Sequence, residues 1–97
     1  MPELLTTDEI AEANVSLPQW TVDGATLVRA VQADSFAGGI RLVDEVAVVA
    51  DEMNHHPDVD IRWTTITFHL STHFKGGLTQ NDVELAHEID AITEKPH

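Results

Sequence analysis

Hydrophobic residues recur along this chain at two spacings. The first, a repeat of three and four residues, indicates helices. Thr6 and Glu9 have the spacing of a capping box, so a first helix is predicted over residues 7–14. From Ser35 onward, apolar residues recur at steps of four and three, which predicts the longest helix, ending near Asn54. The apolar residues expected on its buried face are Phe36, Ile40, Val43, Ala47 and Ala50.

The other spacing, an alternation of apolar and polar residues, indicates strands. Trp20 and Val22 lead into Asp23-Gly24, the strongest short turn signal in the chain. Residues 26–32 continue the alternation and are expected to form the second strand of this hairpin. A first hairpin is therefore predicted between the first two helices.

A second hairpin is predicted between residues 59 and 70. If Thr64 and Thr65 form its two-residue turn, antiparallel pairing places three apolar pairs on one face, toward the helices. The same register places His56 opposite His73, with Cβ atoms about 4.5–5.5 Å apart. The three apolar pairs are Val59 with Leu70, Ile61 with Phe68, and Trp63 with Ile66.

The last predicted element is a helix over residues 80–92, where Thr79 and Asp82 repeat the capping box. Residues 94–97 are expected to fray. The order helix, hairpin, helix, hairpin, helix indicates an α+β fold, in which three helices cover one face of a four-stranded antiparallel sheet. We expect residues 1–97 to form this single domain.

Composition narrows the classes of function. With 97 residues and 42% hydrophobic content, the chain can bury one modest core, and so small a domain gains from self-association. The 17 acidic residues exceed the 5 basic ones and give a net charge of −12, which disfavours nucleic acid and anionic membranes as partners. The absence of cysteine excludes disulfides and thiolate metal sites. No apolar run approaches the ~20 residues of a membrane span and no targeting segment is recognised, so a cytoplasmic protein is expected.

Short motifs with defined spacing carry the clearest functional signal. The run His55-His56-Pro57 is followed by Trp63, by Leu70-Ser71-Thr72-His73, and by Gly77-Leu78-Thr79 with Asp82. This pattern resembles the pterin-4a-carbinolamine dehydratase family, thinly over most of the chain and densely from residue 51 to residue 86. The resemblance implies the α+β fold derived above and assembly as a homodimer or homotetramer. It also implies dehydration of a 4a-hydroxytetrahydropterin to the quinonoid dihydropterin, which recycles the cofactor of aromatic amino acid hydroxylases.

The histidines suit this reaction. Loss of the 4a-hydroxyl as water needs a proton on oxygen, and the quinonoid ring forms when a ring nitrogen loses a proton. Histidine, with an unperturbed pKa of about 6.5, can serve at either step. Under the resemblance, His55 is a candidate acid and His73 a candidate base in a partly exposed site, the two roles being exchangeable, while His56 is expected to hold the pterin. No metal or organic cofactor is needed, because the reaction transfers no electrons and requires no strong Lewis acid. Candidate substrate-binding residues are Thr72, Asp51 or Asn54, and Asp82.

Several of these residues also have a purely structural explanation. Asp82 is explained first as the third residue of a capped helix, and a role in the site comes second. His69 is expected to pair with Asp60 on the outer face of the second hairpin. Asn81 stands where many family members carry a basic residue, and Asp58 and Asp60 stand where relatives often have aromatic residues. These departures bear on the identity of the pterin more than on the type of reaction.

Two other functional classes compete with a dehydratase. The family fold also serves as a dimerisation or assembly module, but relatives so used can lose the histidines that this chain retains. A metal site formed by His69 and His73 is disfavoured, because four residues of strand span roughly 13 Å at about 3.3 Å each. Ligand bonds to zinc are only about 2.0–2.1 Å long. A dehydratase is therefore the preferred hypothesis.

Overall fold

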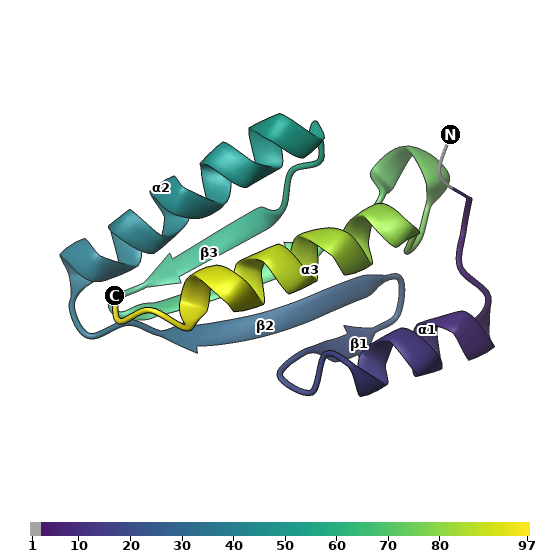
Figure 1. The fold of residues 1–97 in the computed structure, drawn as a ribbon, viewed down its shortest axis with the longest axis horizontal. Helices are drawn as coiled ribbons and strands as arrows, with labels where there is room; N and C mark the ends of the chain where they lie inside the picture. The colour runs from purple at the N-terminus through teal and green to yellow at the C-terminus, as the bar shows by residue number, and fades with distance from the viewer. Residues whose placement is uncertain (1–2) are drawn as a thin grey trace.

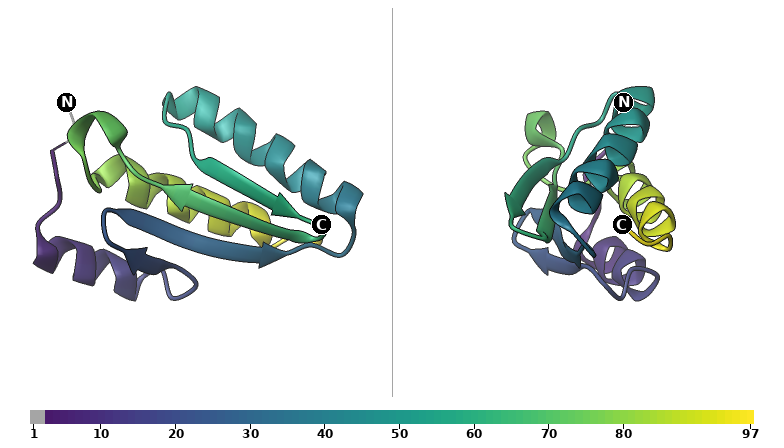
Figure 2. Two further views of the ribbon diagram at one scale, coloured as in Figure 1. Left: turned by 180° about the vertical axis from the view of Figure 1, so that it is seen from behind. Right: turned by 90° about the vertical axis from the view of Figure 1, so that its left-hand side faces the viewer.

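One antiparallel sheet carries three helices on a single face in this computed structural model, which describes residues 3–97. The strands lie in the order β1-β2-β4-β3 (Figure 1), and the end-on view in Figure 2 shows the helices on one side of the sheet. The predicted α+β class and element order are confirmed. Within the described residues, no helix combines the length and apolar content needed to cross a membrane. The elements are α1 (Thr7–Val15), β1 (Thr21–Asp23), β2 (Thr26–Gln32), α2 (Phe36–Met53), β3 (Asp58–Arg62), β4 (Thr65–Leu70), the 3-10 helix η1 (His73–Lys75) and α3 (Gln80–Thr93).

The helix ends follow from their capping residues. Both bonds of the predicted box at α1 are present, since the Glu9 N–H donates to Thr6 Oγ1 (3.1 Å) and the Thr6 N–H donates to Glu9 Oε1 (2.8 Å). At the end of α2, Asn54 adopts a left-handed conformation with φ of 50°. The N–H of His55 then donates back to the Ala50 carbonyl at 3.0 Å. A terminus of this kind stops the helix and fixes the direction in which His55 leaves it.

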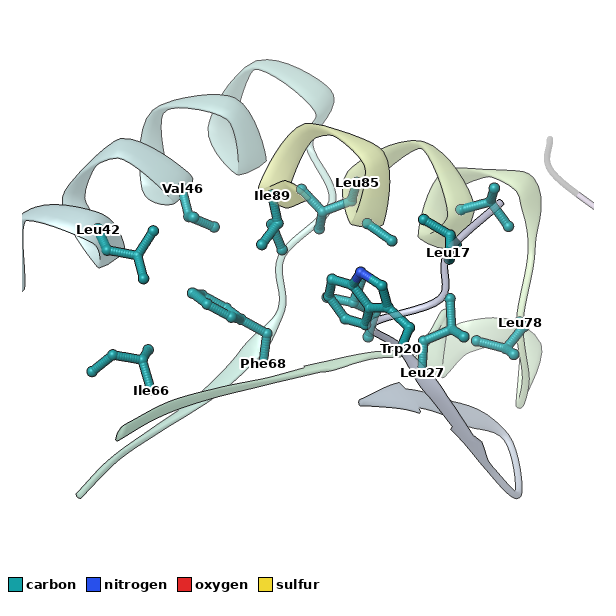
Figure 3. Packing of buried hydrophobic residues seen from close by; sticks show 13 residues of the cluster. Leu17, Trp20, Leu27, Leu42, Val46, Ile66, Phe68, Leu78, Leu85 and Ile89 are labelled. Atoms are coloured by element: carbon teal, nitrogen blue, oxygen red, sulfur yellow. The ribbon is translucent and has the colours of Figure 1, made fainter. Parts of the chain in front are cut away.

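The hydrophobic core lies between the inner face of the sheet and the helices (Figure 3). The inner strand β4 contributes Ile66, Phe68 and Leu70, whose side chains have no exposed surface. Burial of such a side chain contributes roughly 1.5–3 kcal/mol, so β4 anchors the sheet to the helices. Other core residues are Leu17, Trp20, Leu27, Leu42, Val46, Leu85 and Ile89.

The buried face of α2 agrees only in part with the predicted one, since Ala50 is buried and Val43 packs against the core. Phe36 is 49% exposed and Ala47 is exposed, although both were expected to face the core. Gly39 explains the difference, because a Cβ at this position would lie only 2.9 Å from Cδ1 of Ile66. The glycine therefore lets the helix backbone approach β4. The buried residues of α2 are Gly38, Gly39, Leu42, Val46 and Ala50.

The turn of the second hairpin is also displaced from its predicted position. Trp63 and Thr64 form the turn, rather than Thr64 and Thr65. Trp63 has a φ of 55° and is 77% exposed, so it stays outside the core, where its ring stacks on Phe36 at the start of α2. The cause is a long-range contact: Thr64 is buried, its carbonyl accepts the N–H of Ala33 at 2.8 Å, and its hydroxyl accepts from the Gln32 amide.

The displaced turn changes which residues pair across β3 and β4, but it does not change the face of the sheet on which their side chains lie. Val59 lies opposite Phe68, and Ile61 opposite Ile66, instead of the predicted partners. Because the register moves by an even number of residues, the apolar residues that remain in the ladder stay on the helix side, and only Trp63 leaves the set. Val59 packs against the core, while Ile61 on the edge strand is 41% exposed.

The C-terminal segment packs against the domain, contrary to the expected frayed tail. Nε2 of His97 lies 2.5 Å from Oε2 of Glu45, and the His97 side chain is 9% exposed. The His97 carbonyl accepts the N–H of Asp34. Gly38 makes room for this contact, since a Cβ there would lie 2.2 Å from the His97 backbone.

Candidate active site

Three chain segments meet around one cavity of about 220 Å³. They are the loop that follows α2, the residues after β4, and η1. The cavity brings together all three candidate catalytic histidines and two of the candidate substrate-binding residues. Its lining residues are Asn54, His55, His56, Ser71, Thr72, His73 and Phe74.

His56 and His73 reach this cavity without the cross-strand pairing that the sequence predicted. The ladder ends where Asp58 pairs with His69, because β3 begins at Asp58 and β4 ends at Leu70. His73 instead begins the 3-10 helix η1. The pairing is wrong because the register is displaced and the chain leaves the ladder after β4, yet both histidines still line the same cavity.

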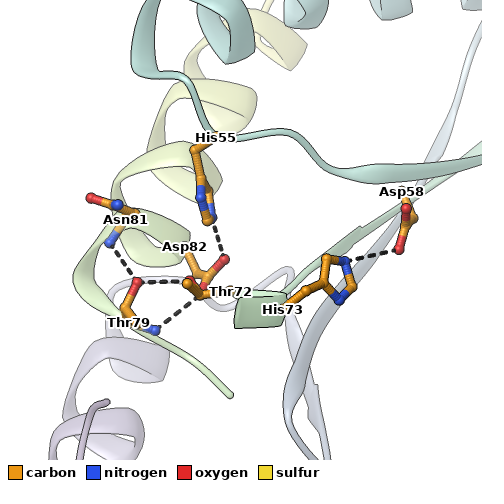
Figure 4. A network of polar contacts seen from close by, with 7 residues as sticks. All are labelled: His55, Asp58, Thr72, His73, Thr79, Asn81 and Asp82. Carbon is orange, nitrogen blue, oxygen red and sulfur yellow. Dashed lines mark hydrogen bonds and ion pairs between the residues drawn. The ribbon is translucent and has the colours of Figure 1, made fainter. Parts of the chain in front are cut away.

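The buried centre of the site is the pair formed by His55 and Asp82 (Figure 4). Nε2 of His55 lies 2.6 Å from Oδ1 of Asp82, and the two side chains are 8% and 0% exposed. The partly exposed environment expected of His55 is therefore wrong, because the left-handed turn at Asn54 leads this residue inward, toward α3. A buried carboxylate is tolerated only when its oxygens are hydrogen-bonded.

Two threonines complete the hydrogen bonds of that carboxylate. Oδ2 of Asp82 accepts the N–H of Thr79 (2.9 Å) and the hydroxyl proton of Thr72 (2.8 Å). Since Thr72 has only one hydroxyl proton, Thr79 is the donor in the 2.8 Å contact between the two hydroxyls. Asp82 thus forms the predicted capping box of α3 and also holds His55.

The two ring nitrogens of His55, a residue that lines the cavity, differ in their surroundings. A carboxylate only accepts hydrogen bonds, so the bond to Asp82 places a proton on Nε2 of His55. Nδ1 has no hydrogen-bond partner among residues 3–97, where no fully buried side-chain nitrogen or oxygen lacks one. Nδ1 is therefore accessible to solvent. In the neutral ring this atom carries the free lone pair.

His56 stands between the histidine cavity and a second, mostly apolar one of about 170 Å³. Its Nε2 lies 2.9 Å from Oδ1 of Asp51, with both side chains more than half exposed. Of the two alternatives offered by the sequence, Asp51 contacts His56, whereas Asn54 lines the histidine cavity. Besides His56, the residues that line the apolar cavity are Val43, Val46, Ala47, Ala50, Asp51, Pro57 and Val59.

The third histidine has a carboxylate partner that the sequence did not indicate. Nε2 of His73 lies 3.5 Å from Oδ2 of Asp58, and each side chain is 72% exposed. The strand register does not reveal this neighbour, since Asp58 pairs with His69 and His73 lies four residues further along, in η1. The predicted surface contact of His69 with Asp60 is confirmed at 2.8 Å, although Asp60 pairs along the ladder with Thr67.

Sequence reasoning did not assign Thr79 or Phe74 to the site. Thr79 was recognised as a helix cap and as part of the family motif, but the proximity of its hydroxyl to Thr72 depends on the tertiary fold. Phe74 had a visible signal, namely an aromatic residue directly after His73. Among the described residues, no group of three or more histidine or carboxylate side chains is arranged to hold a metal ion.

Comparison of the sequence with known proteins gives consistent matches over nearly the whole chain. The sequence model of the family described as Pterin 4 alpha carbinolamine dehydratase matches residues 3–92. A protein of Nocardia farcinica with the provisional name pterin-4-alpha-carbinolamine dehydratase is 53% identical over 90 residues, which are 93% of this chain and 95% of that protein. A protein of Mycobacterium tuberculosis with the same name is 46% identical over 89 residues, or 92% and 95% of the two chains.

Solved structures agree with the sequence matches. The crystal structure of a transcriptional coactivator/pterin dehydratase from Brucella melitensis has a TM-score of 0.89 and 28% identity, covering 94% of this chain and 99% of that one. A pterin dehydratase-like protein identified as a RuBisCO assembly factor in the α-carboxysome has a TM-score of 0.62. It covers 76% of this chain and 86% of that one at 19% identity, which shows a likeness of fold alone. By its family match and its identity to these relatives, the chain belongs to the pterin-4a-carbinolamine dehydratase family.

Proposed function

We propose that this protein dehydrates a 4a-hydroxytetrahydropterin to the quinonoid dihydropterin. The observation that carries the proposal is the convergence of His55, His56 and His73 on one cavity. Family membership supports the substrate class. The product would return to the tetrahydropterin cofactor, which links the protein to an aromatic amino acid hydroxylase.

The reaction requires one acid and one base. The bond from C4a to the hydroxyl oxygen breaks, and this oxygen takes one proton and leaves as water. One proton leaves a ring nitrogen, so the reaction consumes no net proton and no electron. Two histidines of the cavity can supply these two transfers near neutral pH.

The geometry favours His55 as the base, the reverse of the assignment made from the sequence. His55 lines the cavity, its Nδ1 is accessible to solvent with a free lone pair in the neutral ring, and its Nε2–H donates to Asp82 at 2.6 Å. A proton taken up at Nδ1 would produce an imidazolium directly beside a buried carboxylate, which stabilises that charge. Asp82 would then be a positioning residue that fixes the tautomer of His55.

The exposed histidines suit the remaining roles. His73 lies beside Asp58 and is 72% exposed, so as an imidazolium it can donate a proton to the leaving oxygen and be reprotonated by solvent. His56 lies between the two cavities and is held by Asp51. We assign it to binding of the substrate.

A direct rate measurement tests this function. The 4a-hydroxytetrahydropterin is generated in solution, and its dehydration is followed with and without the protein. We expect acceleration over the spontaneous reaction in proportion to protein concentration, and loss of that acceleration when His55 and His73 are both replaced by Ala. A rate equal to the spontaneous one at all protein concentrations would favour the non-catalytic assembly module instead.

We also propose that the protein is a homo-oligomer. The edge strand β3 and the outer stripe of α2 expose Ile61, Phe36 and Val48, at 41%, 49% and 58%. The exposed ring of Trp63 stacks on Phe36 with centroids 6.4 Å apart, which enlarges this apolar surface. An unpaired edge strand beside such a surface favours pairing with a second copy. Light scattering should give a dimer or tetramer mass; a monomer mass across micromolar concentrations would contradict the proposal.

A further inference from the structure

Phe74 is an exposed aromatic residue at the histidine cavity. It lines this cavity directly after His73, and it is 68% exposed. A buried aromatic side chain removes about 150–250 Å² from water, and Phe74 forgoes most of that gain. It also lies outside the hydrophobic core cluster. Packing therefore does not account for an aromatic residue at this position.

The loop that carries Phe74 is held by its backbone. The N–H of Thr72 donates to the Gly77 carbonyl at 2.9 Å, and the N–H of Gly76 donates to the Thr72 carbonyl at 3.0 Å. Gly76 has a φ of 73°, which closes the turn at a residue without a Cβ. The phenyl ring is thus presented from a fixed loop, and its replacement should leave the loop intact.

The surroundings of Phe74 differ from those of the other exposed aromatic residues. Phe36 and Trp63 stack on each other, whereas Phe74 has no stacked aromatic partner within residues 3–97. It is the one apolar side chain among the seven residues that line the cavity. A flat heteroaromatic ring fits such a place, because its edge needs hydrogen-bonding groups and its face needs one apolar surface. A protein partner would instead require a continuous apolar patch.

We propose that Phe74 binds the substrate by stacking on the bicyclic pterin ring, and so holds this ring against the histidines. The identity of the ring rests on the proposed function, but the stacking itself depends only on binding. Aromatic side chains that stack on nucleobases contribute enough for their removal to weaken binding by about tenfold. The expected effect is therefore on affinity and KM rather than on kcat.

Direct binding of a pterin that cannot be dehydrated tests the proposal. The dissociation constant of 7,8-dihydropterin is measured by calorimetry for the parent protein, Phe74→Leu, Phe74→Tyr and the matched control Phe36→Leu. We expect Phe74→Leu to weaken binding by about tenfold, Phe74→Tyr to bind like the parent, and Phe36→Leu to leave binding unchanged. With the 4a-hydroxytetrahydropterin, Phe74→Leu should raise KM by a similar factor at nearly constant kcat.

The possible results separate the stacking role of Phe74 from the proposed reaction. Equal binding by the parent and Phe74→Leu would overturn the stacking role, and so would an equal loss in Phe36→Leu. A parent that binds the dihydropterin but does not accelerate dehydration would refute the proposed reaction, while the variant still decides whether Phe74 stacks. A parent that binds no pterin would overturn both.

Discussion

His55 and His73 lie on the same cavity and each faces a carboxylate, yet the two pairs are opposites in burial. The His55–Asp82 pair has a separation of 2.6 Å and side chains that are 8% and 0% exposed. The His73–Asp58 pair has a separation of 3.5 Å, and each side chain is 72% exposed. Breaking a buried pair leaves an uncompensated charge, whereas an exposed pair contributes only about 0–1 kcal/mol.

This contrast separates two ways of building a site. The buried pair joins the end of α2 to the start of α3, so it belongs to the fold as much as to the chemistry. The exposed pair joins the start of η1 to the start of β3, and neither residue belongs to the hydrophobic core. Substitutions on the buried side should therefore change stability and rate together, and those on the exposed side should change rate alone.

The largest effect is expected for Asp82→Ala. The carboxylate accepts hydrogen bonds from His55, Thr72 and Thr79, and all three donors would lose their partner. We expect the free energy of unfolding to fall by about 3–5 kcal/mol, because each buried donor left without a partner costs about 1–3 kcal/mol. Loss of a helix cap alone would cost about 1 kcal/mol, so urea denaturation distinguishes the two readings.

Asp82→Asn is the control for this prediction. The amide keeps one oxygen acceptor and removes the charge, so more stability should remain than in the alanine variant. A fall of only about 1 kcal/mol in Asp82→Ala would show that the pair with His55 adds nothing beyond the cap.

His55→Ala should have the next largest effect. It removes one of three donors from a buried carboxylate, which should lower the free energy of unfolding by about 2–3 kcal/mol. The loss of the proposed base should also slow dehydration by about 100-fold or more. His55→Gln retains an N–H donor toward Asp82, so it should recover stability without recovering rate. Recovery of rate by this variant would remove His55 from the acid–base roles.

His73→Ala should affect the rate and little else. Because the residue is exposed, we expect the free energy of unfolding to stay within about 0.5 kcal/mol of the parent. The rate should fall by about 100-fold. His69→Ala is the matched control, since His69 also pairs with an aspartate but lies outside the cavity lining. An equal loss of rate in both variants would point to a general effect of surface charge.

Local rules predicted the elements of this fold, and long-range contacts decided the details that the sequence could not reveal. The capping boxes at Thr6 and Thr79 act within one turn of helix, so their pattern is visible in the sequence. The hairpin turn is set by the bond from Ala33 to Thr64, two residues that are distant along the chain. Likewise, Gly39 faces the core because of Ile66 on another element.

The candidate site shows the same division. The spacing of the motifs identified His55, His56 and His73, which do line one cavity. Burial could not be predicted, because His55 turns inward only through the left-handed conformation of Asn54. The dual position of Asp82, at a helix cap and against His55, follows from the approach of α2 and α3 and from no local pattern.

The smallest effect is expected for a third pair, Glu45 with His97, which lies away from the cavity and is intermediate in burial. The hydrogen bond from His97 holds the pKa of Glu45 below its usual value near 4.5. A lowered carboxyl pKa stabilises the fold above the unfolded-state pKa, and this stabilisation is lost as the pH falls through the folded-state pKa. Glu45→Gln should therefore have a lower melting temperature than the parent at about pH 6, and the difference should vanish as the pH is lowered well below 4.5.

Glu52→Gln, on the same exposed helix surface, is the control and should show no such pH-dependent difference. If the melting temperature of Glu45→Gln stays below that of the parent by the same amount in acid, the contact with His97 does not stabilise the fold through charge. If Glu45→Gln also lowers the dehydration rate, this pair is coupled to the cavity.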